Sequence, residues 1–474
     1  MARALAILCL CLICLAGLSS QFLHPLTKHH FASGPKNKHF LNIAFIGERG
    51  SGKSSALGRI LYELAPKPEY DSILAEAEDA GRGDFKYSWL VDTSSDEREA
   101  GSSETSHRVY FEIDHFKISV KDTPGELEAD TIAAVATSNI VVIFVSADTF
   151  GDISEERWMQ WEAVLIAYRI KQIIFVINRS YGDFGLFNRV CDKLQKVIIK
   201  KTGLLLYRAE EIVYIPVDTV TGENILTLAG AGQKLSWYTG KTLIDAIKNL
   251  SPSKASLESN LRFVVDRAEI LNMRESVAYG FPLYGSVLSD MGFVVCPQMT
   301  YPASKQLYSV DGKQIAEIDN RNYGSIQLAG ISAGNVKHVS KGSIISNARD
   351  NPCKSVFNAE VYIELLKIED LRISRYNTIV MHVHNAAYEM TVGTIYAILD
   401  PRTKKEVESA SKEGHGLTYA KGGMGVKLFV DPNQPATFEN DKEFEGLGNF
   451  IVTKKGEVIG FGYTITVYYK GNRI

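Results

Sequence analysis

A glycine-rich octapeptide at residues 47–54, GERGSGKS, fits the pattern G-x-x-x-x-G-K-[ST] at every fixed position. Residues 41–46 before it form an apolar run that predicts a buried strand, and residues 54–64 after it carry apolar side chains at helical spacing. A strand, a glycine-rich turn and a helix in this order form a phosphate-binding loop, because backbone N–H groups at the start of a helix attract anions. The octapeptide therefore predicts binding of a nucleoside triphosphate.

Each fixed residue of this loop has an expected role. The glycines let the backbone wrap the phosphates, Lys53 is expected to reach the terminal phosphates, and Ser54 is expected to coordinate Mg²⁺. A second motif, DTPG at residues 122–125, follows a predicted strand, and its Asp122 is expected to hold Mg²⁺ through water. The residues expected to contact the phosphates are Gly47, Gly50, Ser51, Gly52, Lys53, Ser54, Ser55 and Gly125.

The length of 474 residues is too great for one hydrophobic core and predicts about three domains. With 45% hydrophobic and 23% charged residues, the composition is that of a globular protein. The formal net charge of -3 argues against a strongly basic nucleic-acid-binding surface over the whole protein, although a local basic patch is compatible with it.

The first 20 residues predict a signal peptide. A short positive segment precedes an apolar run at residues 5–18, and small residues at 17–20 offer a cleavage site. Because the run is short for a membrane span, a cleaved leader is favoured over an uncleaved anchor, and no span is expected after cleavage. Either alternative sends the chain into the secretory pathway. Residues 21–40, rich in His and Lys, predict a linker, with a second targeting sequence as the alternative.

Three of the six cysteines lie in the leader, which leaves Cys191, Cys296 and Cys353. Their odd number and wide spacing predict neither a disulfide framework nor a zinc site. His382 and His384 lack a cysteine or carboxylate set beside them and are expected to be ordinary barrel residues. The acidic stretch at residues 439–443 predicts a solvated loop.

The remaining pattern divides the chain into one α/β part and two β parts. Apolar runs that end at residues 120, 145, 177 and 216 alternate with helical stretches at 158–168 and 187–200, which predicts a parallel sheet covered on both faces. From residue 261 onward, short alternating runs separated by turn residues predict β-barrels, with a break near 350–352. The expected domains are residues 41–250, 258–350 and 354–474, with a linker at 251–254.

Further motifs resemble one family. Residues 81–89, GRGDFKYSW, are similar to GKGSFKYAW of elongation factor 1-alpha, and Asp92 with residues 97–101 is similar to its D…ERERG. Residues 447–450, LGNF, are similar to its LGRF near the C-terminus. The chain thus resembles the translational GTPases of the elongation factor 1-alpha and eukaryotic release factor 3 group from about residue 41 to 467. The resemblance implies a P-loop G domain followed by two β-barrels, and GTP or GDP with Mg²⁺ as cofactors.

Two positions of this resemblance depart from the family near the γ-phosphate. Ser103 replaces the switch threonine that closes on Mg²⁺, so the expected metal ligands are Ser54, Ser103 and Asp122. Glu126 replaces the histidine that orients the attacking water. Since catalysis of phosphoryl transfer depends on stabilising developing negative charge, a carboxylate at this catalytic position predicts slow hydrolysis or none.

The base-binding motif N-K-x-D has also changed. Asn178 is retained and Arg179 keeps an aliphatic stem to stack on a base, but Tyr181 replaces the aspartate that pairs with guanine. Loss of this bidentate contact is expected to reduce affinity and discrimination. Asp183 is an alternative carboxylate two residues further on, and the last base-binding loop corresponds to residues 218–220.

These features predict a secretory-pathway descendant of a translational GTPase. It would have weak or no GTPase activity and act as a binding or structural protein with an unknown protein partner. The alternative is an active translational GTPase that delivers aminoacyl-tRNA in the cytosol or in a translating organelle. Transfer RNA and the ribosome are expected as partners only in that alternative.

Overall fold

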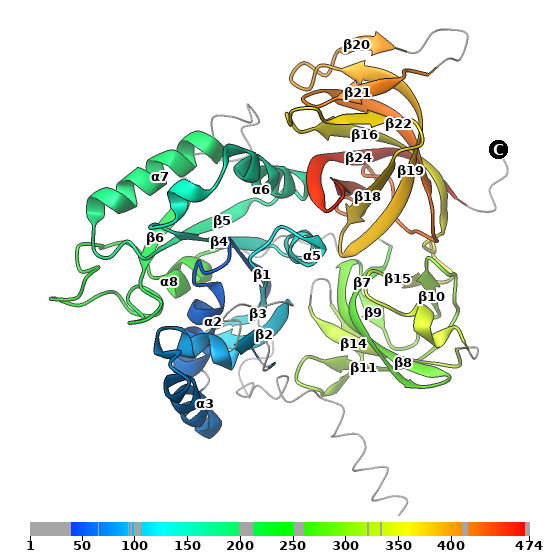
Figure 1. Ribbon diagram of the computed structural model, residues 1–474. Helices are drawn as coiled ribbons and strands as arrows, with labels where there is room; N and C mark the ends of the chain where they lie inside the picture. The colour runs from blue at the N-terminus through cyan, green and yellow to red at the C-terminus, as the bar shows by residue number, and fades with distance from the viewer. Residues whose placement is uncertain are drawn as a thin grey trace, which may run out of the picture.

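The computed structural model describes residues 39–64, 66–92, 94, 97–98, 106–198, 212–250, 260–319, 322–331, 334–409 and 416–469. Over these residues the chain forms a mixed sheet covered by helices, followed by two β-barrels (Figure 1). The predicted fold class is therefore confirmed. The predicted signal peptide, most of the linker at 21–40, the linker at 251–254 and the predicted metal ligand Ser103 lie outside the described residues.

The first sheet has the strand order β2-β3-β1-β4-β5-β6. All neighbours are parallel except β2, which runs antiparallel to β3 at the edge. The strand β2, HRVYFEI, was not predicted from the sequence, and its three consecutive apolar residues at 109–111 are buried. The six strands are β1 (His39–Ile46), β2 (His107–Ile113), β3 (Phe116–Asp122), β4 (Ile140–Ser146), β5 (Gln172–Asn178) and β6 (Val213–Val217).

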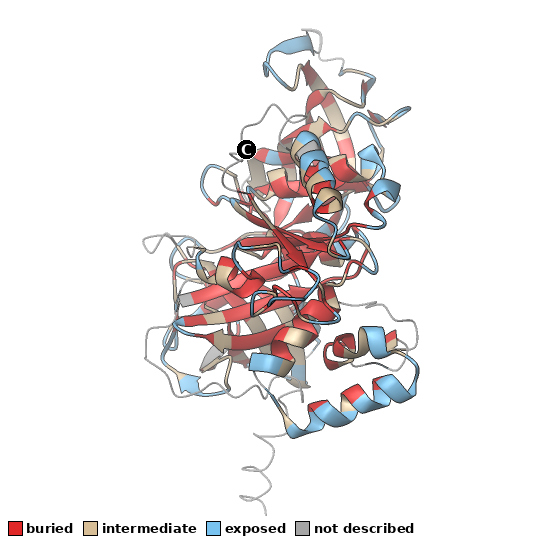
Figure 2. Ribbon diagram, turned by 90° about the vertical axis from the view of Figure 1, so that its left-hand side faces the viewer, coloured by how far each residue is buried: buried red, intermediate tan, exposed pale blue. Residues whose placement is uncertain are grey.

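Helices cover both faces of this sheet, and the strands between them are the most buried part of the domain (Figure 2). Alternate residues of β1 face opposite sides, so that Ile43 packs in the core under α2 and α8, and Ile46 in the core under α5, α6 and α7. The helical segments are α2 (Lys53–Leu64), α3 (Pro68–Asp79), η2 (Gly83–Leu90), α5 (Ala129–Ala136), η3 (Phe150–Asp152), α6 (Glu155–Ala167), α7 (Phe184–Ile198) and α8 (Leu243–Lys248). Among the described helices, none combines the length and the apolar character that crossing a bilayer requires.

The first barrel has a seven-stranded antiparallel sheet in the order β10-β15-β7-β8-β14-β11-β12 and a small β13-β9 ribbon. Its inward side chains form one core that includes Phe263, Phe293 and Ile326. Its elements are β7 (Arg262–Asn272), β8 (Glu275–Tyr284), β9 (Val287–Leu288), β10 (Phe293–Cys296), β11 (Ala303–Ser309), β12 (Gln314–Ile315), β13 (Glu317–Ile318), β14 (Gly324–Ala329), η5 (Val336–His338) and β15 (Ile344–Asn347).

The second barrel has the order β18-β23-β24-β16-β22-β19-β20, and an additional β18–β19 pairing closes the ring. Closure leaves fewer unpaired strand edges than an open sheet would have. Its strands are β16 (Val356–Leu365), β17 (Arg372–Ser374), β18 (Thr378–Val383), β19 (Ala386–Leu399), β20 (Glu406–Ser409), β21 (Tyr419–Lys421), β22 (Gly425–Pro432), β23 (Asn449–Lys454) and β24 (Glu457–Tyr469).

Buried charges join the α/β domain to the first barrel. Asp266 of β7 accepts from Arg108 at 3.0 Å, from Lys121 at 3.3 Å and from the hydroxyl of Tyr323 at 3.2 Å. Burial alone would raise the pKa of the Asp266 carboxyl, but the charges of Arg108 and Lys121 outweigh it and hold this pKa well below its usual value. Separating the domains would leave these buried charges without their partners, which is energetically costly. The cluster therefore holds the first barrel against β2 and β3.

The acidic stretch at residues 439–443 lies at an interface, so the prediction of a solvated loop is wrong. Glu439, 4% exposed, accepts from Arg262 of the first barrel at 2.7 Å and from Tyr469 at 2.9 Å. Asp441 pairs with Arg169, beyond the end of α6, at 2.8 Å. The carboxylates of this stretch therefore join the second barrel to both other domains.

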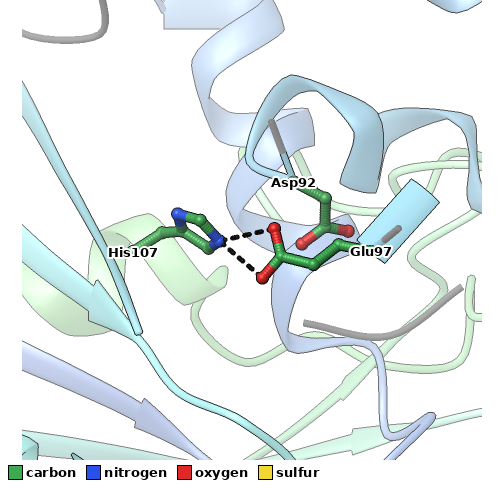
Figure 3. Close-up of side chains that lie close together, drawn as sticks. All are labelled: Asp92, Glu97 and His107. Atoms are coloured by element: carbon green, nitrogen blue, oxygen red, sulfur yellow. Dashed lines mark hydrogen bonds and ion pairs between the residues drawn. The ribbon is translucent and has the colours of Figure 1, made fainter. Parts of the chain in front are cut away.

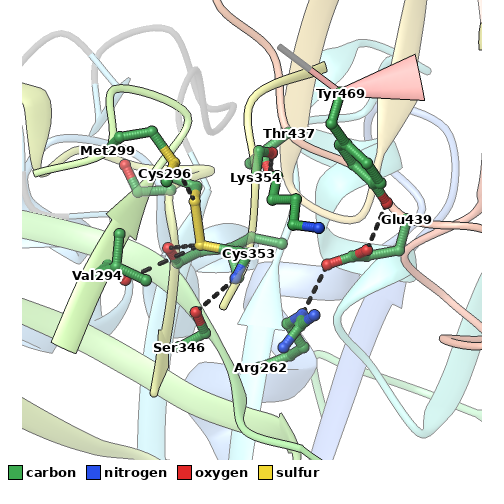
Figure 4. The surroundings of a disulfide bond; sticks show 12 residues. Arg262, Val294, Cys296, Met299, Ser346, Cys353, Lys354, Thr437, Glu439 and Tyr469 are labelled. Carbon is green, nitrogen blue, oxygen red and sulfur yellow. Dashed lines mark hydrogen bonds and ion pairs between the residues drawn. A yellow bond between two sulfur atoms is a disulfide. The ribbon is translucent and has the colours of Figure 1, made fainter. Parts of the chain in front are cut away.

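The cysteine spacing predicts no disulfide framework, but the structure contains a disulfide. Cys296 and Cys353 form a disulfide, and both residues are fully buried (Figure 4). Cys296 ends β10, and Cys353 lies in the connection between the two barrels, 57 residues further along the chain. Sequence spacing could not reveal this pair because tertiary folding brings the connection back onto β10. Cys191 remains a free thiol.

Loss of the disulfide is expected to lower stability substantially. We expect Cys353→Ser to reduce the free energy of unfolding by roughly 2–4 kcal/mol, because the bond closes a long loop in the unfolded chain. Urea unfolding with and without a reducing agent measures this change. Cys191→Ser is the matched control, and the reducing agent should destabilise this variant as much as it destabilises the wild type. Equal stability of Cys353→Ser and the wild type would contradict the expectation.

A cavity of about 350 Å³ lies where the three domains meet. It is lined by Ala133 of α5, by Lys341 of the first barrel and by His382 and His384 of the second. His382 bonds to the hydroxyl of Thr453 at 2.9 Å. Both histidines are buried, and this burial lowers the pKa of each imidazole to about 4.

Acid is therefore expected to destabilise this junction. An imidazole of the unfolded chain has a pKa of about 6.5, so the unfolded state binds more protons as the pH falls from about 6.5 to about 4. The free energy of unfolding should decrease over this interval by about 2.5 kcal/mol for each histidine.

The variant His384→Asn tests this expectation, since asparagine tolerates the positive φ of 44° at this position. Its unfolding free energy should depend less on pH between 6.5 and 4.5 than that of the wild type. The exposed His115 provides the control variant His115→Asn. An equal pH dependence in both variants would contradict the assignment.

Candidate functional site

A cavity of about 370 Å³ opens at the carboxyl edge of the parallel strands. Connections that follow β1, β3, β5 and β6 meet there, as is usual for ligand sites of open α/β sheets. The residues lining it are Arg49, Gly50, Gly52, Lys53, Ser54, Ser55, Asp84, Phe85, Ser88, Asp92, Thr123, Gly125, Asn178, Arg179, Tyr181, Asp218, Thr219, Val220, Thr221 and Lys234. The structure thus brings most of the predicted nucleotide-binding residues into one cavity.

The glycine-rich loop forms the inner wall of this cavity. The ammonium of Lys53 donates to the carbonyls of Gly47 at 2.9 Å and Glu48 at 3.2 Å, so its charge lies within the curve of the loop. Burial lowers the pKa of Lys53 from its ordinary value. Gly52 must be glycine, since its φ is 100° and an added Cβ would lie 2.5 Å from Nδ2 of Asn178.

Ser54 and Asp122 meet beside Lys53. The hydroxyl of Ser54 donates to Oδ2 of Asp122 at 2.6 Å. Oδ1 of Asp122 is buried and has no hydrogen-bond partner among the described residues. Burial raises the pKa of this carboxyl to about 6, which the nearby Lys53 only partly offsets. A serine hydroxyl and a buried carboxylate oxygen are ligands that suit Mg²⁺, so this pair fits the expected metal.

Side chains of α6 hold the glycine-rich loop in place. Oε1 of Glu48 accepts from Nε of Arg157 at 2.9 Å and from the indole N–H of Trp161 at 3.1 Å. Both donors come from the same face of α6, one turn apart. The sequence analysis did not identify this support, because the pattern leaves the residue after Gly47 unspecified.

The DTPG segment packs tightly against the loop. A Cβ added to Gly125 would lie 2.4 Å from the backbone nitrogen of Arg49, so only glycine allows this approach. The side chain of Glu126, 57% exposed, pairs with Arg49 at 3.9 Å. Glu126 is described by the structure but is not among the residues that line the cavity. The carboxylate of Glu126, the predicted catalytic residue, therefore lies in solvent at the rim of the cavity and not inside it.

Asn178 connects the phosphate end to the base end. Its amide donates to the carbonyl of Ser51 at 3.1 Å and to the hydroxyl of Thr219 at 3.3 Å. Residues 178–180, NRS, match a glycosylation sequon, but Asn178 is 3% exposed, so its side chain does not project into solvent. Asn178 therefore positions both loops.

Tyr181 occupies the position of the family's guanine-binding aspartate. Tyr181 is 63% exposed, and its hydroxyl donates a hydrogen bond to the carboxylate of Asp148 at 3.1 Å. Arg179 pairs with the same carboxylate at 3.7 Å. Asp183 does not substitute, because its Oδ1 accepts from the amide of Leu186 in α7 and the residue is not among those lining the cavity.

The sequence analysis missed several residues of the cavity wall. Asp84, Phe85 and Ser88 come from η2, and Asp92 follows it. Lys234 lines the opposite end and lies 3.5 Å from Asp218. The signal for η2 was present in residues 81–89, which match the family closely, but no local pattern indicated that this segment folds over the nucleotide site.

The fold and the cavity define a P-loop nucleotide-binding protein with two appended β-barrels. Residues 38–253 match the elongation factor Tu GTP binding domain, and residues 357–465 match the GTP-eEF1A C-terminal domain-like family. Elongation factor 1-alpha of Methanospirillum hungatei is 26% identical over 92% of this chain and 99% of that protein. That of Plasmodium falciparum is 25% identical over 90% and 95%, respectively.

Solved structures show the same fold. The GTPase-like domain of Ski7 from S. cerevisiae, bound to GDP and inorganic phosphate, has a TM-score of 0.73 at 15% identity, covering 90% of this chain and 97% of that domain. The bacterial selenocysteine-specific elongation factor EF-Sec has a TM-score of 0.61 at 14% identity, covering 92% of this chain and 60% of that protein. The two domain matches, together with relatives that align along nearly the whole chain, show that it belongs to the translational GTPase superfamily and is elongation factor 1-alpha-like.

Restoring the family's carboxylate at the base end is expected to restore selectivity. We expect Tyr181→Asp to raise the preference for GDP over ADP at least tenfold, because a carboxylate can accept two guanine N–H groups. Competition binding with both nucleotides measures the preference. The equally exposed Tyr376 offers Tyr376→Asp as a control with no effect, and an unchanged preference in Tyr181→Asp would contradict the assignment.

Proposed function

We propose that this protein binds GTP and GDP with Mg²⁺ and that its phosphate end supplies most of the affinity. The observation that carries the proposal is that Lys53 and Ser54 line one cavity at the sheet edge and that Ser54 bonds to the buried Asp122 behind it. The helix α2 begins at Lys53, so the N–H groups of its first turn add to the attraction for phosphate. Magnesium would neutralise phosphate charge beside Asp122 when bound.

We further propose that the protein acts in translation elongation, with aminoacyl-tRNA and the ribosome as partners. Relatives named elongation factor 1-alpha align with nearly the whole chain, including both barrels. This support favours the translational alternative over the secretory-pathway function that the sequence analysis preferred. Glu126 and its ion pair with Arg49 support slow hydrolysis, because a negative group at the rim does not stabilise developing negative charge.

Thermal unfolding with and without GDP and Mg²⁺ tests nucleotide binding. At a hundredfold excess over the dissociation constant, bound ligand adds about 2.7 kcal/mol, or roughly 5–10 °C in melting temperature. Lys53→Ala should remove the shift, whereas Lys171→Ala, at an exposed position outside the cavity, should keep it. No shift in the wild type would contradict the proposal.

GTP turnover in the presence of ribosomes tests the elongation role and its rate. The wild type should hydrolyse GTP slowly, and Glu126→His should increase kcat at least tenfold because a neutral imidazole can orient water. Equal kcat for the wild type and Glu126→His would contradict the role given to this position. Absence of ribosome stimulation in both proteins would contradict the elongation role while leaving nucleotide binding intact.

A second candidate is a function in the secretory pathway. Two observations favour it: the leader-like first 20 residues, and the Cys296–Cys353 disulfide, since disulfides persist in oxidising compartments. N-terminal sequencing of the native protein and mass analysis of alkylated thiols separate the candidates. A start near residue 21 with an intact disulfide favours export, and a retained Met1 with three reactive thiols in residues 191–353 favours the cytosol.

A further inference from the structure

A cluster of metal-ligating side chains lies beside the nucleotide cavity. Asp92, Glu97 and His107 each offer one ligand atom, and these atoms lie within 4.8 Å of one another (Figure 3). Nε2 of His107 is 3.0 Å from each carboxylate oxygen of Glu97. Two zinc ligands at bonds of about 2.1 Å and a tetrahedral angle are roughly 3.4 Å apart, so little rearrangement would seat an ion between them.

Burial distinguishes this cluster from an ordinary acidic surface. Asp92 is 1% exposed and Glu97 3% exposed, and the His107 side chain is 15% exposed. In the β2–β3 ladder His107 lies opposite Asp122 and shares its face of the sheet, which adds a third buried carboxylate nearby. Oδ1 of Asp122 has no hydrogen-bond partner among the described residues. Lys53 offsets part of the charge of Asp92 and Asp122, and the two carboxylates and the imidazole of the cluster supply three largely buried ligand groups for a divalent cation.

Neighbouring groups hold the carboxylates in position. The hydroxyl of Ser94 donates to Oε2 of Glu97 at 3.1 Å and accepts from the Glu97 amide at 3.1 Å. Arg98 donates to the carbonyl of Asp92 at 2.9 Å and to that of Trp89 at 3.1 Å. Ser94 therefore orients the Glu97 carboxylate as an outer-sphere group does in metal sites, and Arg98 fixes the backbone at Asp92.

We propose that Asp92, Glu97 and His107 form a binding site for a divalent transition-metal ion of the Zn²⁺ type, separate from the nucleotide-associated Mg²⁺. An imidazole with two carboxylates suits transition metals, whereas Mg²⁺ prefers oxygen ligands alone. Three protein ligands leave a coordination position open. Since Asp92 also lines the nucleotide cavity, the ion would join that wall to the start of β2.

Titration of the full-length, nucleotide-free protein with Co²⁺, a spectroscopic substitute for Zn²⁺, tests the site. We expect visible absorption from Co²⁺ in a site of low coordination number, displacement by Zn²⁺, and no competition from millimolar Mg²⁺. His107→Gln should weaken Co²⁺ binding about 100-fold, and Glu97→Gln, which preserves the shape of the side chain, should weaken it at least tenfold. Circular dichroism melts confirm that both variants fold.

Two controls separate this site from other metal binding. His115→Gln, at an exposed position of the β2–β3 turn, should bind Co²⁺ as the wild type does. Histidines of residues 21–40 are present in every variant, so the difference between the wild type and His107→Gln reports the proposed site alone. Ser54→Ala should lose the Mg²⁺-dependent binding of GDP and retain Co²⁺ binding. His107→Gln should retain the Mg²⁺-dependent binding of GDP and lose Co²⁺ binding.

Equal Co²⁺ affinity in the wild type and His107→Gln would overturn the proposal, and so would displacement of Co²⁺ by Mg²⁺. Absence of Co²⁺ absorption in the wild type would also overturn it and would leave His107 and Glu97 as a hydrogen-bonded pair that joins β2 to the preceding segment. None of these outcomes depends on whether the protein binds or hydrolyses GTP.

Discussion

Parallel pairing of strands that are distant in sequence determines where the chemistry of this protein can occur. The β1–β3 register places Phe45 beside Asp122, so the segment after β1 starts next to that carboxylate. The β5–β6 register places Asn178 beside Val217, two residues before Thr219. Because parallel strands end at a common edge, four connections meet there and form one cavity. Each contact between the phosphate end and the base end depends on this register.

The antiparallel β2–β3 pair links the cavity to the barrels. Consecutive residues of a strand face opposite sides. On one side His107 lies opposite Asp122, beside the nucleotide cavity, and on the other side Arg108 lies opposite Lys121. Arg108 and Lys121 both contact Asp266 of the first barrel. A shift of β2 at the cavity would therefore also move Arg108 and alter its contact with Asp266 at the domain interface.

Local patterns predicted the parts of the structure that depend on local chemistry. The glycine-rich loop and the strand before it could be identified because their residues are adjacent in the sequence and the loop's backbone conformation demands glycine. The Cys296–Cys353 bond and the Arg262–Glu439 pair could not, since they join residues 57 and 177 positions apart through the packing of whole domains. The sequence left open whether Asp183 replaces the carboxylate that binds guanine. In the structure its side chain instead accepts a hydrogen bond from the amide of Leu186, in the first turn of α7.

The two ends of the cavity differ in how they relate to the family. Lys53, Ser54 and Asp122 lie together at the end proposed to hold phosphate and Mg²⁺, while Tyr181 places an aromatic ring where the family motif N-K-x-D implies a carboxylate. An aromatic ring can stack on either purine, because stacking does not read the hydrogen-bonding edge of the base. The phosphate end is therefore expected to provide affinity and the base end little selectivity.

Calorimetric titration of the wild-type protein with GDP and with ADP, each with Mg²⁺, tests this account most directly. It predicts that the two dissociation constants differ by less than about tenfold, since a lost bidentate contact removes most of the discrimination between bases. A preference for GDP of about a thousandfold or more would contradict it, because such selectivity requires a bidentate contact to the base that a tyrosine at position 181 cannot make.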